Sequence, residues 1–160
     1  MDKNVTMLLN EQINKEFSSA YLYLNIANYY EARGLDGFAH WFEAQAGEEQ
    51  EHGMRIYRYM QDNNSKVELE TIEKPERTYN DAMAPLKEAL EHERYITASI
   101  NGIYLAAQSV NDFRTMQFLD WFINEQAEEE KTASDMIVKM ELCGLDHGLY
   151  ILNKEFWGRK

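Results

Sequence analysis

The sequence predicts an all-α protein: a four-helix bundle with one long crossover and a short fifth helix near the C-terminus. Apolar residues recur with a helical period along nearly all 160 residues, and no alternating strand pattern competes with it. Both prolines, Pro75 and Pro85, fall in the middle of the chain and leave long uninterrupted stretches on either side. We expect one domain over residues 1–160.

The first half of the chain predicts a helical hairpin. Its first helix covers about 5–32, where the apolar stripe consists of Leu9, Ile13, Ala20, Tyr23, Ala27 and Tyr30. A short break follows, in which Gly34 can take the left-handed conformation that ends a helix and Asp36 can cap the next one. The second helix covers about 36–62, and its inward residues are Phe38, Phe42, Ala46, Ile56 and Met60.

The second half predicts another hairpin after a long connection. Residues 63–80 lose the helical period, and helices follow over about 81–109, 112–143 and 147–156, the last after a possible Asp146 cap. Pro85 fits only in a first helical turn. A connection of about 18 residues can span about 60 Å, whereas a 28-residue helix is about 42 Å long. The crossover can therefore run the length of the bundle and make the second and third helices parallel.

Composition limits the partners. The net charge is −12, from 28 acidic and 16 basic residues, which argues against nucleic acid and anionic membranes and suits cations. A single cysteine, Cys143, permits no internal disulfide and fits a reducing cytoplasm. The chain has neither a signal-peptide pattern nor a stretch of about 18 apolar residues. We expect a cytoplasmic protein.

Each long helix places a carboxylate on its apolar face. These residues are Glu16, Glu49, Glu93 and Glu129, accompanied by His52 and Gln126. The same 33-residue spacing separates Glu16 from Glu49 and Glu93 from Gln126, which indicates two diverged copies of one hairpin. Because each pair lies at one height on its hairpin, both pairs should meet near the middle of the bundle.

Buried carboxylates require compensation, which bound cations would supply. Burying each uncompensated charge costs several kcal/mol. Four carboxylates balance two divalent ions charge for charge, and oxygen ligands with one imidazole suit Fe(II) or Mn(II), although Zn(II) could also bind. We therefore expect these side chains to point inward at metal, whereas Glu51 beside them is solvated.

The chain resembles the bacterial non-haem ferritins over essentially its full length. The resemblance lies in NEQINKEFSSAYLYL, HWFEAQAGEEQEHGMR, EHERYITASI, FINEQAEEEKTASDMI and LYILNKEFW. It implies that Glu16, Glu49 and His52 hold a first iron, and that Glu49, Glu93 and Glu129 hold a second with Gln126 nearby. In that family, a tyrosine that matches Tyr23 lies beside the two irons. Without the resemblance, Tyr23 would be interpreted as a core tyrosine.

Two departures separate the chain from neighbouring families. Bacterioferritins and rubrerythrins carry a second Glu-x-x-His, where this chain has Gln126 and Glu129. Bacterioferritins also bind haem through a methionine at the position of Gln50, and rubrerythrins append a cysteine-rich iron domain that one cysteine cannot supply. We therefore expect no haem.

The resemblance implies iron storage. A ferroxidase centre would oxidise Fe(II) with O2 or H2O2, and Fe(III) mineral would be stored in a 24-subunit shell. The sequence itself indicates only a homo-oligomer, because apolar residues surround the helix over 20–30. The alternatives are a rubrerythrin-like di-iron oxidase or peroxidase without storage, and a metal-free helical interaction protein.

Glu125 and Glu128 precede Gln126 and Glu129 by one residue each, as Glu48 precedes Glu49. This offset turns them by about 100° towards the bundle's edge, where they form either a solvated acidic face or the third iron site that the resemblance implies. We expect His40, His92 and His147 to lie on the surface. We also expect the helix over 147–156, with Leu149, Ile151, Leu152 and Phe156, to serve assembly, because it follows a completed core.

Overall fold

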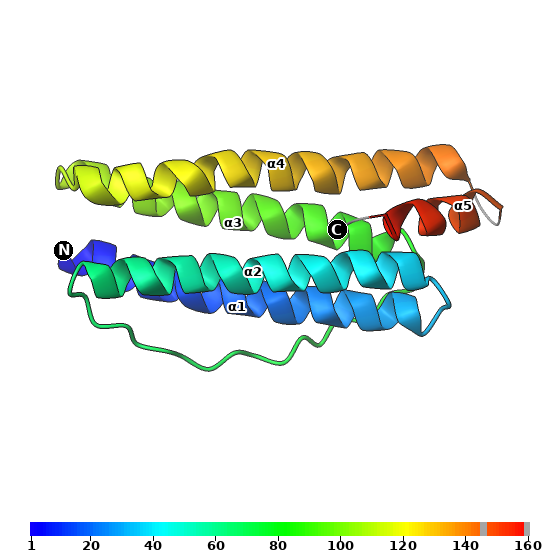
Figure 1. The fold of residues 1–160 in the computed structure, drawn as a ribbon, viewed down its shortest axis with the longest axis horizontal. Helices are drawn as coiled ribbons and strands as arrows, with labels where there is room; N and C mark the ends of the chain where they lie inside the picture. The colour runs from blue at the N-terminus through cyan, green and yellow to red at the C-terminus, as the bar shows by residue number, and fades with distance from the viewer. Residues whose placement is uncertain (145–146, 159–160) are drawn as a thin grey trace.

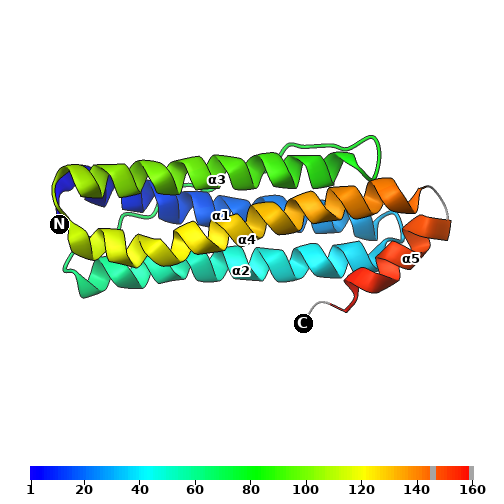
Figure 2. The same cartoon turned by 90° about the horizontal axis from the view of Figure 1, so that it is seen from above.

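The computed structural model describes residues 1–144 and 147–158, with the backbone alone for His147. In these residues the chain forms five α-helices, namely α1 (Lys3–Glu31), α2 (Asp36–Asp62), α3 (Ala84–Ser109), α4 (Phe113–Cys143) and α5 (His147–Phe156). The first four lie side by side as an elongated bundle, and α5 packs against one end (Figures 1 and 2). This arrangement confirms the predicted fold class. None of the described helices is long and apolar enough to cross a membrane.

The topology is that of two hairpins joined by a crossover. Helices α1 and α2 run antiparallel, as do α3 and α4, and the segment 63–83 travels the length of the bundle along α1 (Figure 1). The crossover returns the chain to the other end, so α2 and α3 point in the same direction, as the loop lengths predict.

Asparagine side chains of α1 hold the extended crossover in place. Asn10 Oδ1 accepts a hydrogen bond from the backbone N–H of Glu68 at 2.8 Å, and Asn14 Nδ2 donates to the carbonyl of Thr71 at 3.1 Å. These side chains provide partners for backbone groups that no regular secondary structure satisfies.

Two helix starts differ from the sequence-based expectation. Gly34 takes a positive φ of 71° as expected, but Asp36 does not cap α2. Instead, Asn153 of α5 accepts hydrogen bonds from the N–H groups of Gly37 (2.9 Å) and Phe38 (3.1 Å). Asp36 in turn accepts from Asn153 Nδ2 at 2.7 Å, so it braces the residue that performs the capping.

Helix α3 begins later than expected, at Ala84, with Pro85 in its first turn. Asp81 lies in the preceding turn, where its Oδ1 accepts hydrogen bonds from the N–H groups of Met83 (2.9 Å) and Ala84 (2.8 Å). Asp81 therefore precedes the helix instead of starting it. The possible cap Asp146 lies outside the described residues.

The core consists of two apolar clusters. The cluster near α5 contains Tyr23, Tyr30 and Phe42, and the opposite cluster contains Ile13, Ile56 and Ile96. Buried polar side chains lie in the helices between them. The fold thus places a polar layer across the middle of an apolar bundle.

The expectation that α5 follows a completed core is wrong for two of its residues. Leu152 and Phe156 are 4% and 5% exposed and belong to the cluster near α5. The ring of Phe156 packs edge-on against Phe38, with 4.5 Å between centroids. The bundle is therefore closed at this end by α5 itself, whereas Ile151 points outwards with 66% of its surface exposed.

Candidate metal centre

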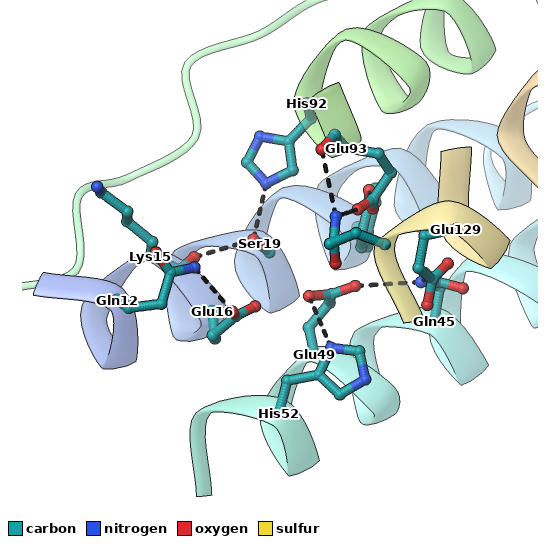
Figure 3. A network of polar contacts seen from close by, with 12 residues as sticks. Gln12, Lys15, Glu16, Ser19, Gln45, Glu49, His52, His92, Glu93 and Glu129 are labelled. Atoms are coloured by element: carbon teal, nitrogen blue, oxygen red, sulfur yellow. Dashed lines mark hydrogen bonds and ion pairs between the residues drawn. The ribbon is translucent and has the colours of Figure 1, made fainter. Parts of the chain in front are cut away.

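The polar layer contains every carboxylate that the sequence places on an apolar face. Each of the six polar side chains is at most 7% exposed: Glu16 of α1, Glu49 and His52 of α2, Glu93 of α3, and Gln126 and Glu129 of α4. Figure 3 shows most of them converging from different helices at the middle of the bundle. The structure therefore brings both hairpins' polar residues together, as their equal spacing predicts.

One half of the cluster has ligand atoms without hydrogen-bond partners. Glu16, Glu49 and His52 each offer one ligand atom, and these atoms lie within 4.8 Å of one another. Glu16 Oε2 and His52 Nδ1 are buried without a hydrogen bond, and His52 Nδ1 lies 3.6 Å from Glu49 Oε2. Buried polar atoms are normally paired. Two such atoms facing a carboxylate fit the coordination of a divalent cation.

Hydrogen-bond donors occupy the other half. Tyr23 Oη donates to Glu93 Oε1, and Gln126 Nε2 donates to Glu93 Oε2 at 3.0 Å. Gln45 Nε2 donates to Glu129 Oε2 at 2.9 Å and to Glu49 Oε1 at 3.1 Å. In the described part of the chain, Glu49, Glu93 and Glu129 do not draw together within 4.8 Å as the first group does.

Sequence reasoning missed Gln12 and Gln45. Gln12 Nε2 donates to Glu16 Oε1 at 2.8 Å, as Gln45 does to Glu49 one hairpin arm later. The signal was available, because each glutamine precedes its glutamate by four residues and the two glutamines are separated by 33 residues. The hairpin repeat thus includes the residues that orient the carboxylates.

Burial and mutual repulsion dominate the electrostatics of the cluster. Burial and the charge of Glu49 raise the pKa of Glu93 to about 7, and burial with Glu93 and Glu49 raises the pKa of Glu129 to about 8. The pKa of Glu16 is also raised well above its ordinary value, for the same reasons. These carboxyls therefore require a proton or a cation near neutral pH.

For His52 the surroundings favour the charged form, whereas for the carboxyls they favour the neutral form. Burial disfavours the imidazolium, but Glu49, Glu16 and Glu129 outweigh burial and raise the pKa of His52 to about 9. A divalent cation would replace this positive charge and would bind the neutral imidazole.

The expected third group is arranged differently from the sequence prediction. Glu48 and Glu128 are exposed, and Glu125 is half-buried. The carboxylate of Glu125 instead joins His52 and Glu129, with ligand atoms within 4.8 Å of one another. Glu48, Glu125 and Glu128 do not form such a group among the described residues. Glu125 is thus the member that reaches the main centre.

The expectation that the remaining histidines lie on the surface is wrong for two of them. His92 is half-buried, and its Nε2 lies 2.7 Å from Ser19 Oγ. Its ring packs edge-on against Tyr23, and burial lowers the pKa of His92. His40 is half-buried and stacks on Trp157, whereas the side chain of His147 lies outside the described residues.

The fold and the cluster define a class of proteins. Four-helix bundles with one long crossover and inward-facing carboxylates from all four helices are the scaffold of di-metal carboxylate proteins. Comparison with known proteins agrees with this class and narrows it. The family model described as the ferritin-like domain matches residues 6–143.

Several relatives match over nearly the whole chain. The bacterial non-heme ferritin of Campylobacter jejuni is 35% identical over 156 residues, which cover 96% of this chain and 93% of that protein. The bacterial non-heme ferritin of Staphylococcus epidermidis is 34% identical over 160 residues, which cover 99% of this chain and 96% of that protein. A structure described as an open pore ferritin from the archaeon Archaeoglobus fulgidus is 35% identical, with a TM-score of 0.98. The match covers 100% of this chain and 99% of that one. The chain belongs to the ferritin family.

Proposed function

We propose that this protein stores iron, and that the polar layer of the bundle is a ferroxidase centre with Fe(II) as its substrate. The observation that supports the proposal most directly is the group of Glu16, Glu49 and His52, with two buried ligand atoms that lack hydrogen bonds. Family membership supports storage as the purpose of the reaction.

The proposed ligands divide between two ions. Glu16, Glu49 and His52 hold the first Fe(II), and Glu49, Glu93 and Glu129 hold the second, with Gln126 and Tyr23 braced against Glu93. Each Fe(II) loses one electron, so two ions supply the two electrons that, together with two protons from solvent, reduce O2 to H2O2, or H2O2 to two molecules of water. Oxygen ligands with one imidazole suit this metal.

Fe(III) then passes to mineral inside a hollow homo-oligomeric shell, for which we propose 24 subunits and a cytoplasmic location. Glu125, with Glu48 and Glu128 farther out, would form a third and looser site on this route. Glu125 supports that role because its carboxylate approaches His52 and Glu129.

Size-exclusion chromatography after Fe(II) loading in air tests the function. We expect a particle of several hundred kilodaltons that contains far more than two irons per chain. A small oligomer with two irons per chain would instead favour the rubrerythrin-like alternative. Protein without iron would contradict both functions.

A further inference from the structure

Gln45 lies where two carboxylates from different hairpins face each other. It is 1% exposed, and its Nε2 lies 3.1 Å from Glu49 Oε1 of α2 and 2.9 Å from Glu129 Oε2 of α4 (Figure 3). A primary amide has two N–H groups, and here each is directed to a different carboxylate. A single nitrogen atom therefore satisfies one oxygen of each.

The two halves of the cluster differ in this respect. Glu16 Oε2 and His52 Nδ1 have no hydrogen-bond partner, so a metal ion can bind there without displacing a donor once the imidazole is neutral. Both oxygens of Glu93 accept hydrogen bonds, from Tyr23 and Gln126, and Gln45 engages the facing oxygens of Glu49 and Glu129. The first half is thus open and the second half is filled by donors.

We infer that Gln45 is a positioning residue that holds the place of the second metal ion. Its NH2 group carries partial positive charge between two carboxylates, where a cation shared by Glu49 and Glu129 would lie. The second ion binds only after this amide moves away, so Gln45 weakens the second binding step, whereas its contact with Glu49 Oε1 only orients a ligand of the first ion. The inference rests on the proposed function, which assigns Glu49 and Glu129 to that ion.

Gln12 provides a matched control within the same chain. It is equally buried, precedes Glu16 by four residues and donates to Glu16 Oε1 at 2.8 Å. Its Oε1 accepts a hydrogen bond from Ser99 Oγ at 2.6 Å, which fixes the orientation of the amide. Gln12 engages one carboxylate, whose Oε2 remains available. Gln12 therefore orients one carboxylate ligand, whereas Gln45 lies between two carboxylates.

Anaerobic titration of the full-length protein with Co(II) tests the inference, because Co(II) is not oxidised under these conditions and binding is measured without turnover. Calorimetry and the visible absorption of bound Co(II) should resolve the two tighter steps per chain, ahead of binding at the looser third site. In Gln45→Met, which keeps the side-chain length but removes both donors, we expect the second step to tighten about tenfold. The first step should not tighten, because Glu49 loses a donor that orients it.

The control variant and a second Gln45 variant should change the two Co(II) binding steps in different ways. Gln12→Met should leave the second step unchanged and weaken the first, because Glu16 loses its orientation. Gln45→Lys places an ammonium group among the same carboxylates, so we expect the second step to disappear and the first to remain. If Gln45→Met does not assemble, Gln45→Lys tests the inference by itself.

Two results would overturn the inference: a second step that is unchanged or weaker in Gln45→Met, or two ions bound with wild-type affinity by Gln45→Lys. A general structural effect would shift both steps together. If the wild-type protein itself bound fewer than two ions, the metal pair of the proposed function would fail. If it binds two and the Gln45 variants behave as wild type, only the role of Gln45 fails.

Discussion

At the scale of single residues, Glu49 connects the two halves of the cluster. Its Oε1 accepts from Gln45, and its Oε2 lies 3.6 Å from His52 Nδ1. We expect Glu49→Ala to slow Fe(II) oxidation by at least about a hundredfold, beyond the 10–100-fold loss typical of an outer-shell partner. The stability of the metal-free protein should not fall, because the substitution removes repulsion among buried carboxylates.

For Glu49→Ala, the oxidation rate is measured by absorbance after mixing with Fe(II). Size-exclusion chromatography verifies that the variant assembles. Glu51→Ala is its control, because Glu51 lies on the same helix with its side chain 77% exposed. The control should oxidise iron at the wild-type rate. Oxidation at that rate by Glu49→Ala would refute the site assignment.

The raised pKa values predict how stability depends on pH. The metal-free folded protein keeps protons on Glu93 (pKa about 7) and Glu129 (about 8) that the unfolded chain releases near pH 4.5. Its free energy of unfolding should therefore fall as pH rises from about 5 to 8. His52 acts in the same direction, because its stabilisation is complete below pH 6.5 and is lost as pH rises through about 9.

Denaturant unfolding of metal-free protein across pH 5–9 measures this dependence, and we expect a total loss of several kcal/mol. Protein saturated with Co(II) under anaerobic conditions should lose much less, because the ion replaces the protons. Stability that rises with pH in the metal-free protein would show that the carboxyls are already ionised near pH 5.

The sequence predicted the charged members of the site and the amide of Gln126, but not the amides of Gln12 and Gln45. A carboxylate on an apolar face conflicts with the helical pattern, so Glu16, Glu49 and Glu93 can be found by inspection. A glutamine on the same face conflicts less, and only the geometry shows which carboxylate Gln45 serves. The burial of His92 depends on packing between helices, which its own helix does not reveal.

At the scale of elements, the contact between α2 and α5 requires a glycine. A Cβ atom at Gly37 would lie 1.7 Å from the carbonyl oxygen of Asn153, the residue that caps α2. We expect Gly37→Ala to displace α5 and remove the cap. The loss of unfolding free energy should be about 1–3 kcal/mol, the range for lost caps and forced packing shifts. Thermal denaturation of the metal-free protein measures it.

Gly47 is the control for this prediction, because it lies on the same helix and a Cβ there meets nothing within 4 Å. Gly47→Ala should stabilise α2 by up to about 1 kcal/mol, as alanine does in a helix interior. Equal effects of the two substitutions would contradict the role assigned to Gly37. First-ion affinity should be unchanged in both variants, since neither residue is a proposed ligand.

Helices and topology follow from the sequence more directly than helix ends do. Apolar periods and loop lengths are properties of continuous segments, and they give the four long helices and the crossover. The cap of α2 comes instead from Asn153, more than 100 residues away. Asp36 has the right residue type for a cap, and only the tertiary structure shows that it braces Asn153.

At the scale of the whole molecule, large apolar side chains remain exposed on several helices, among them α1 and α5. On α1, Tyr21 and Leu24 are 49% and 50% exposed. On α5, Tyr150 and Ile151 are 58% and 66% exposed, although Leu152 and Phe156 of the same helix are buried. Exposed apolar side chains of this extent are typical of contacts between subunits. Helix α5 thus has one face for its own bundle and another available for assembly.

The buried and exposed faces of α5 can be tested separately. Leu152→Ala removes a side chain that is 4% exposed, so it should lower the stability of the subunit by about 2–5 kcal/mol. Ile151→Glu changes a residue that is 66% exposed, so the subunit should keep its fold while the assembled particle dissociates. Light scattering measures the particle, and circular dichroism with the first Co(II) binding step measures the subunit. An intact shell in Ile151→Glu would show that this face of α5 does not contact a neighbouring subunit. Loss of metal binding together with the shell would show instead that the centre depends on assembly, although its proposed ligands all belong to one chain.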